Sequence, residues 1–300
     1  MSATDDIDDS AAPLIEHLAE LRTRLIRSVL AFIVGMIICF SFGSAILDFL
    51  LVPIEKTMRN LGNPNPVMQY TAPQEYFFTL IRISMVGGLA ISFPVIATQL
   101  WRFVAPGLYK NEKNAFLPFI IASPALFLLG AAFAHYVVVP LAMQFFLGFS
   151  DAASYLAALV VDGDGRTSGI DIVFNGKVNE SLDITLKMIV AFGLCFQLPV
   201  LLTLMGKAGL VSTQGLRNVR KYAVVGILLL AALVTPPDVV TQLILFVVVY
   251  GLYEVSIFLV SRVEAKREKQ LRADGYYDDD VEDPLMAEFD EPEDDEGDLK

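Results

Sequence analysis

The sequence predicts an all-α polytopic membrane protein with six transmembrane helices. Apolar residues make up 55% of the chain, and the mean hydropathy is +0.56. The apolar segments show no two-residue alternation, which argues against a β-barrel. A membrane helix needs about 20 apolar residues, because each residue rises about 1.5 Å and the hydrocarbon core is about 30 Å thick. Six mostly apolar stretches carry no charge, namely Ser28–Leu47, Ile83–Trp101, Asn114–Ser150, Met188–Gly206, Tyr222–Pro237 and Val239–Tyr253.

Residues 1–27 are expected to form a cytoplasmic amphipathic segment before the first span. One apolar face repeats at spacings of four, three and four residues, formed by Leu14, Leu18, Leu21 and Leu25. Ser10 is a suitable N-cap, and Pro13 is tolerated in a first helical turn. The first residues are acidic and the apolar run that follows is long enough to span. We therefore expect this region to be retained as part of the protein.

Residues 28–260 are expected to hold the six transmembrane helices. The third apolar stretch is too long for one helix, so Pro140 is expected to end its membrane part. This leaves an outer loop near residues 141–187. The last two stretches hold 16 and 15 residues, which reach about 24 and 22 Å as helices. Helices 5 and 6 should therefore be short, and the bilayer should thin around them.

Residues 261–300 are expected to form a cytoplasmic, acidic and disordered tail. The chain has a net charge of −12, but residues 273–300 alone carry 14 acidic residues and one lysine. The rest of the chain has a net charge of +1. Such a run of acids with few apolar residues is typical of a solvated appendage.

The distribution of basic residues predicts the orientation in the membrane. Fifteen basic residues border the spans on the side of the N-terminus, and six lie on the other side in longer segments. Because cytoplasmic segments carry the excess of Lys and Arg, both termini should be cytoplasmic. This agrees with an even number of spans, which places both termini on the same side of the membrane.

Three short segments could carry the function. Glu20 lies off the apolar face of the N-terminal segment, and a helical pair with Arg24 is its simplest structural explanation. In the segment after the second span, aromatic residues suit a membrane interface and Pro106 breaks the helix. Asp238 follows two prolines before the last span, where it would make a good N-cap.

These segments resemble the signature stretches of the TatC family, the multispanning receptor subunit of the twin-arginine protein translocase. The similarity covers about residues 11–262, in the same order and with the same six-span layout. The matching runs are His17-Leu-Ala-Glu20-Leu-Arg22-Thr-Arg24-Leu, Phe103-Val-Ala-Pro-Gly-Leu-Tyr109-Lys110-Asn-Glu112 and Thr235-Pro-Pro-Asp238.

The resemblance implies a signal-peptide binding site at the cytoplasmic surface. Glu20 and Glu112 fall where the family places the carboxylates that bind the Arg-Arg pair, and a carboxylate can hold a guanidinium bidentately as it cannot hold Lys. Phe103 would pack the apolar part of the signal, and Arg22 would orient Glu20 or bind lipid phosphate. The family motifs also include Pro53, Pro106, Tyr109, Lys110 and Asp238, although Pro53 could equally be a simple turn residue.

Polar residues inside the spans form a second candidate set. Gln197 lies near the middle of the fourth span, where the family commonly has Glu, so a proton-linked role of that carboxylate is in doubt here. Thr235 and Gln242 lie where the family contacts its single-span partners TatA and TatB. A helix–helix hydrogen bond within the protein is the alternative explanation.

The sequence favours a receptor and assembly scaffold, not an enzyme. It would bind Arg-Arg signal peptides of folded proteins and nucleate the export complex as a homo-oligomer in the cytoplasmic (inner) membrane, driven by the proton-motive force. We expect no cofactor, metal or nucleic-acid partner. A secondary transporter would show inverted repeats and mid-membrane charges, and an intramembrane hydrolase would need a partner for His135. Neither pattern is found in the sequence.

Overall fold

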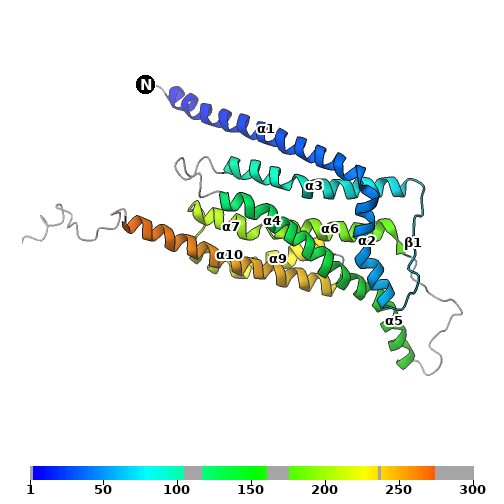
Figure 1. The fold of residues 1–300 in the computed structure, drawn as a ribbon. Helices are drawn as coiled ribbons and strands as arrows, with labels where there is room; N and C mark the ends of the chain where they lie inside the picture. The colour runs from blue at the N-terminus through cyan, green and yellow to red at the C-terminus, as the bar shows by residue number, and fades with distance from the viewer. Residues whose placement is uncertain (1–2, 105–116, 161–175, 236–237, 274–300) are drawn as a thin grey trace, which may run out of the picture.

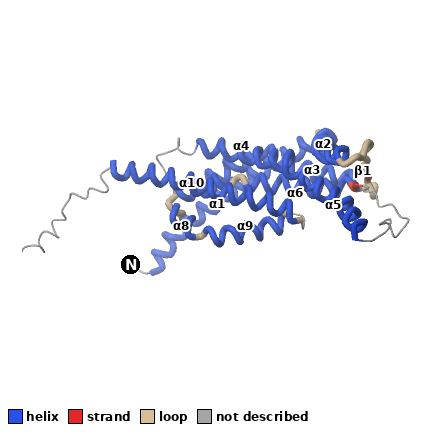
Figure 2. The backbone as a smooth tube through the Cα atoms, turned by 90° about the horizontal axis from the view of Figure 1, so that it is seen from below, coloured by secondary structure: helices blue, strands red, loops and turns tan. Residues whose placement is uncertain are grey.

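The computed structural model describes residues 3–104, 117–160, 176–235 and 238–273. Most of them lie in helices that run side by side along one axis (Figure 1). We call the end of this bundle that carries α2 and the strands the α2 end, and the opposite end the α8 end. Figure 2 shows α8 and the start of α1 at the α8 end. The predicted all-α architecture is confirmed for the described residues, with one pair of two-residue strands added to it.

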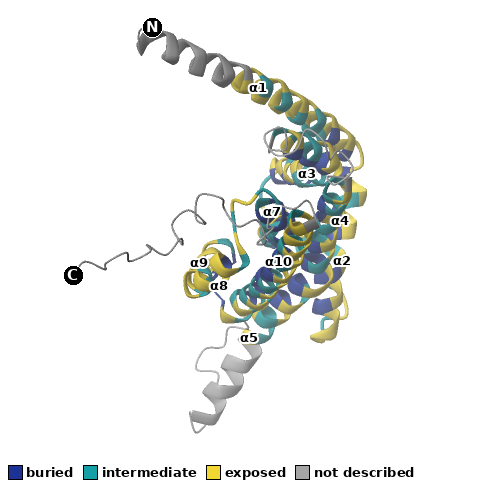
Figure 3. Cartoon of the chain, turned by 90° about the vertical axis from the view of Figure 1, so that its left-hand side faces the viewer, coloured by how far each residue is buried: buried dark blue, intermediate teal, exposed yellow. Residues whose placement is uncertain are grey.

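The first helix, α1 (Ala3–Ser41), joins the N-terminal segment and the first span without a break. The helix begins before Ser10, so the predicted N-cap at Ser10 is wrong. α1 packs mainly on α3 (Glu75–Val104), where Gly35 and Gly88 let the two backbones approach closely. Only 11% of the apolar window within His17–Ser41 is buried, and Figure 3 shows α1 at the edge of a curved arrangement of helices.

The segment between the first two spans contains a helix and a short strand that the sequence did not predict. It contains α2 (Gly43–Asn60) and β1 (Met68–Gln69), which pairs in parallel with β2 (Gly176–Lys177). Pro53 lies inside α2 and is buried, so its explanation as a simple turn residue is wrong. The hydroxyl of Thr57 donates to the carbonyl oxygen of Pro53 at 2.9 Å, one turn along the same helix.

The third apolar stretch stays helical through Pro140. It forms α4 (Leu117–Phe133), a π-helical turn (Ala134–Val138) and α5 (Val139–Val160). Proline lacks the N–H that an α-helix needs, and a π-helical turn widens the backbone where that bond is missing. The helix therefore continues past Pro140, where the membrane part of this stretch is expected to end. Much of the segment expected as an outer loop near residues 141–187 is helical, since α5 reaches Val160 and α6 (Val178–Cys195) begins at Val178.

The fourth span is interrupted near its middle. α6 ends at Cys195, and α7 (Leu198–Lys207) follows after Phe196 and Gln197. Pro199 cannot donate a backbone hydrogen bond and its ring would clash with the carbonyl group four residues earlier, which accounts for the break. Gln197 donates from its backbone to Leu194 at 3.0 Å and accepts from Leu201 at 2.9 Å, so the chain resumes almost the same direction.

The last helices differ in length. After α8 (Thr213–Asn218), α9 (Arg220–Val234) holds 15 residues, which confirms a short helix. α10 (Val239–Ala273) holds 35 residues and continues past Glu254 into the charged segment, so the prediction of a short final helix is wrong. Among the described residues, five helical stretches are long and apolar enough to cross a membrane, and α9 is not one of them.

The main core lies where α2, α5, α6 and α10 meet. Its buried side chains come from several helices and include Leu47, Ile54, Val138, Leu182, Phe192, Leu245 and Val260. A smaller cluster around Phe93, Trp101 and Phe127 connects α3 with α4 and α7. These two clusters hold α3, α4, α6, α7 and α10 together, while α1 and α9 lie at the margins.

Candidate functional site

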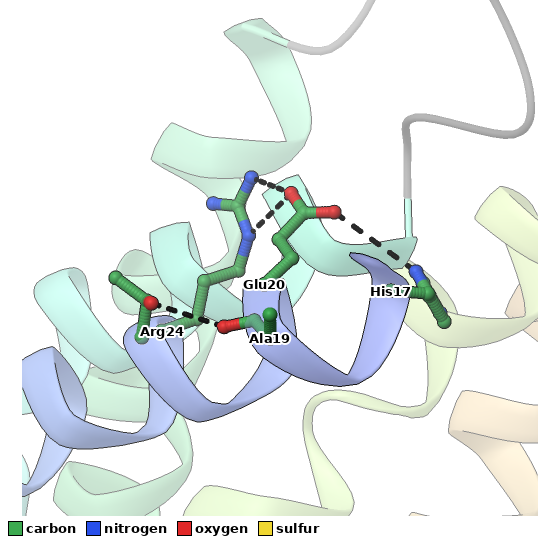
Figure 4. A network of polar contacts seen from close by, with 5 residues as sticks. His17, Ala19, Glu20 and Arg24 are labelled. Carbon is green, nitrogen blue, oxygen red and sulfur yellow. Dashed lines mark hydrogen bonds and ion pairs between the residues drawn. The ribbon is translucent and has the colours of Figure 1, made fainter. Parts of the chain in front are cut away.

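A polar cluster lies on α1 at the α8 end of the bundle (Figure 4). The Arg24 guanidinium donates from Nε to Glu20 Oε1 at 2.9 Å, and its Nη2 donates to the same oxygen. The other carboxylate oxygen, Oε2, lies 3.9 Å from His17 Nδ1, beyond hydrogen-bonding distance. The predicted pair of Glu20 with Arg24 is therefore confirmed, and it uses one of the two carboxylate oxygens.

The Glu20 carboxylate is accessible to other ligands. The Glu20 side chain is 34% exposed, and Arg22, two residues further along α1, is exposed. The Glu20–Arg24 pair is part-buried, and a pair spaced four residues apart on a helix contributes only about 0.3–0.5 kcal/mol. A guanidinium that approaches from outside therefore competes with a weak internal partner. The second oxygen offers a further acceptor.

The end of α3 reaches this cluster. The Phe103 ring stacks on the His17 imidazole with centroids 4.4 Å apart and planes inclined by 17°. The first and second candidate segments are thus in direct contact, although 86 residues separate these two positions. No role for His17 was predicted from the sequence. Its spacing of three residues from Glu20 on the same helix could have indicated that the two side chains are neighbours.

Pro106, Tyr109, Lys110 and Glu112 lie outside the described residues. Their segment begins directly after α3, so it starts next to the contact between His17 and Phe103. Whether Glu112 approaches Glu20 stays a prediction.

Gln197 joins two helices inside the bundle. Its Nε2 donates to the Ser123 carbonyl oxygen at 2.9 Å, and the Ser123 hydroxyl donates to Gln197 Oε1 at 2.6 Å. Ser123 on α4 is buried, and the sequence analysis did not identify it. These bonds satisfy both ends of the amide across the break between α6 and α7. The site is therefore a helix–helix contact with a neutral side chain.

The third candidate segment caps α10 at the α2 end. Asp238 is buried, and its Oδ1 accepts from the Thr241 backbone N–H at 2.6 Å while Oδ2 accepts from the Thr241 hydroxyl. The predicted N-cap is confirmed. The Thr235 hydroxyl donates to Ala231 within its own helix at 2.8 Å, and Gln242 is half-buried. Among the described residues, no hydrogen bond joins the side chains of Thr235 and Gln242.

The arrangement as a whole is that of a membrane receptor or transport component. Several helices are long and apolar enough to cross a bilayer, and the partly exposed Glu20 lies at one end of the bundle. Within the described ranges, no group of three or more His, Cys, Asp or Glu side chains could hold a metal ion. The polar pairs inside the bundle connect helices, which is a structural role.

Comparisons with known proteins identify the family. Residues 16–247 match the family model described as Sec-independent protein translocase protein (TatC). A TatC protein of Magnetococcus marinus is 43% identical over 284 residues, covering 92% of this chain and 97% of that protein. A TatC protein of Aquifex aeolicus is 37% identical and covers 87% of this chain and 99% of its own length. A crystal structure described as the twin-arginine translocase receptor TatC superposes with a TM-score of 0.67 at 37% identity, covering 83% of this chain and 99% of that one.

The chain therefore belongs to the TatC family. It is a multi-pass membrane subunit of a Sec-independent protein translocase, a transport component and not an enzyme. The family match begins at residue 16, just before His17 and Glu20, and ends within α10. The acidic residues beyond α10 lie outside it.

Proposed function

We propose that this chain is the subunit that binds the Arg-Arg signal peptides of folded proteins, with Glu20 and Glu112 as the two carboxylates. The observation that carries the proposal is the contact between the Glu20 cluster and the end of α3. The stack of His17 on Phe103 brings Glu20 close to the start of the segment that holds Glu112. Two carboxylates carried by these segments would match two adjacent guanidinium groups.

Binding would begin with an exchange of partners at Glu20. The internal bond from Arg24 joins two side chains one helical turn apart at a part-buried position, and such a pair contributes only about 0.3–0.5 kcal/mol. A hydrogen bond to a charged group shielded by a bound peptide contributes about 1.5–3 kcal/mol. The signal arginine would also use Oε2, which Arg24 leaves open. Phe103 would contact the apolar part of the signal, and Arg22 would bind lipid phosphate.

The α8 end would face the cytoplasm, with both termini on that side of the inner membrane. The excess of basic residues in the segments at this end supports the orientation. The domain division follows from it, with residues 1–27 and 261–300 cytoplasmic and six spans between them. α9 would be the fifth of these spans despite its 15 residues.

The bound signal would shift the subunit toward assembly with TatA-type and TatB-type single-span partners and further copies of this chain. Gln242 is the proposed contact for a partner helix. Thr235, Asp238 and Gln197 would support that contact indirectly, because their polar atoms already bond within the protein. The membrane potential would supply about 2.3 kcal/mol per charge per 100 mV.

Peptide binding by the purified chain tests the proposal. A labelled Arg-Arg signal peptide and its Lys-Lys version are titrated onto the chain in lipid nanodiscs, with fluorescence anisotropy as the readout. Glu20→Gln is expected to weaken Arg-Arg binding about tenfold or more. Glu55→Gln is the matched control, because Glu55 forms a helical pair with Arg59 on α2 at the same spacing of four residues. Equal effects of both variants, or equal binding of the two peptides, would contradict the assignment of Glu20.

A further inference from the structure

An apolar groove lies between α3, α6 and the end of α9, away from the Glu20 cluster. Its volume is about 690 Å³, within the range of about 300–1,000 Å³ typical of small-molecule sites. Its apolar lining is Met85 and Val86 of α3, Leu186, Val190 and Leu194 of α6, and Leu233 of α9. Leu233 is 83% exposed and Leu194 is 51% exposed, so the groove opens toward the surroundings of the bundle.

Three charged side chains form the rim of the groove at the α2 end. Lys187 Nζ lies 2.6 Å from Asp183 Oδ2, and Arg82 Nη1 lies 3.7 Å from Asp183 Oδ1. Arg82 also donates to Asn179 Oδ1 at 2.8 Å. The three side chains are between 40% and 63% exposed. Two cations and one carboxylate leave the rim with a net charge of +1, which favours an anionic ligand.

The dimensions of the groove match one leaflet of a bilayer. Eleven residues of α6 separate Asp183 on the rim from Leu194, which corresponds to about 16 Å along the helix. Half of the hydrocarbon core is about 15 Å thick. Asp183 lies five residues into α6, about 8 Å from the start of the helix, so the rim is near headgroup depth.

We propose that this groove binds a phospholipid of the leaflet at the α2 end. The headgroup phosphate would be bound by Arg82 and Lys187, and one acyl chain would lie along α6 against Val190 and Leu194. A phosphate on the rim and a hydrocarbon chain below it fit the order of charged and apolar lining. A hydrophobic peptide would fill the apolar part but leave the extra positive charge on the rim without a partner. The site is independent of signal-peptide binding at the α8 end.

Lipid titration tests the site by a charge series. The full chain in mild detergent is titrated with phosphatidylglycerol, and bound lipid is counted by native mass spectrometry. Arg82→Gln combined with Lys187→Gln is expected to weaken binding, by about fivefold for each charge removed. Asp183→Asn is expected to strengthen it about fivefold, because the rim gains positive charge. Arg59→Gln, which removes a cation on α2 outside the groove, should leave binding unchanged.

The apolar part of the groove has its own test. Ala191→Phe places a ring among the lining residues and should abolish retention of the lipid while the rim stays intact. Inorganic phosphate should not displace the lipid, because it cannot occupy the apolar part. Lipid binding that ignores the charge series, or that falls equally with Arg59→Gln, would overturn the proposal. So would cross-linking of a peptide segment, and not lipid, to a probe at Leu194.

Discussion

At the scale of single residues, the same carboxylate chemistry serves two different purposes at the two ends of the bundle. Asp238 is buried and both of its oxygens bond to Thr241, so it is fully used by the start of α10. Glu20 is partly exposed, and one of its oxygens has no close partner. Both residues lie in family motifs, so the sequence alone does not distinguish their roles. Burial and hydrogen bonding separate a structural carboxylate from one that can bind a ligand.

Replacement of Asp238 tests its structural role. Asp238→Ala should lower the free energy of unfolding by about 1–2 kcal/mol, because it removes the N-cap of α10 and leaves Thr241 unsatisfied. Asp238→Asn keeps one acceptor and should cost less. Denaturant unfolding in detergent, followed by circular dichroism, gives the comparison. An alanine variant as stable as the original chain would show that the cap contributes nothing.

At the scale of helices, close backbone contact attaches α1 to the rest of the protein. A Cβ atom at Gly88 would lie 2.7 Å from the backbone nitrogen of Met36, so the two helices would have to separate. α1 has few other contacts, since only 11% of its apolar window is buried. The position of Glu20 next to Phe103 therefore depends on the packing between Gly35 and Gly88.

Two glycine variants test this dependence. Gly88→Ala should destabilise the packing of α1 on α3 by about 1–3 kcal/mol through overpacking. It should also weaken signal-peptide binding, because Glu20 moves relative to α3. Gly251→Ala is the matched control, since nothing lies within 4 Å of its added Cβ and alanine favours the helix. Thermal unfolding and peptide binding are measured on both variants. Equal stability and equal binding of the two variants would contradict this dependence.

The sequence predicted the apolar spans better than the ends of the helices. Hydrophobicity identifies what lies in lipid, so five of the six stretches match helices long and apolar enough to span, and the remaining stretch matches the short α9. It does not detect α2, whose buried face includes Pro53, or the π-helical turn that carries the chain past Pro140. Hydrophobicity also placed the end of the last span at Tyr253, where the first charged residue follows. Charged residues can continue an α-helix outside lipid, so α10 itself extends to Ala273. The partners of Glu20 and Asp238 lie within four residues and could be predicted from spacing. The contacts of Gln197 with Ser123 and of His17 with Phe103 join distant parts of the sequence, so only the fold reveals them.

At the scale of the whole molecule, the length of α9 is less than the thickness of the hydrocarbon core of a bilayer. The 15 residues of α9 reach about 22 Å, while the hydrocarbon core is about 30 Å thick. The end of α9 at Val234 also borders the apolar groove. We propose that α9 spans the bilayer, so that lipid next to it would have to thin, and that this local thinning eases the passage of folded proteins.

Lengthening α9 tests the thinning hypothesis. Insertion of four apolar residues after Gly226 adds about one turn and brings the helix to about 28 Å. Export of a folded reporter with an Arg-Arg signal should stop, while binding of the signal peptide at the α8 end should persist. An insertion of the same residues in the segment after α10 serves as the control. Normal export with the longer α9 would rule out a role for local thinning.

Site-specific photo-cross-linking in native membranes tests the central claim most directly. A probe at Asn111, beside Glu112, is exposed to an Arg-Arg signal peptide and to its Lys-Lys version. The account predicts cross-links to the Arg-Arg peptide alone, and their loss in Glu112→Ala and in Glu20→Gln. Equal labelling of the two peptides, or labelling that survives both substitutions, would contradict a receptor site built from these two carboxylates.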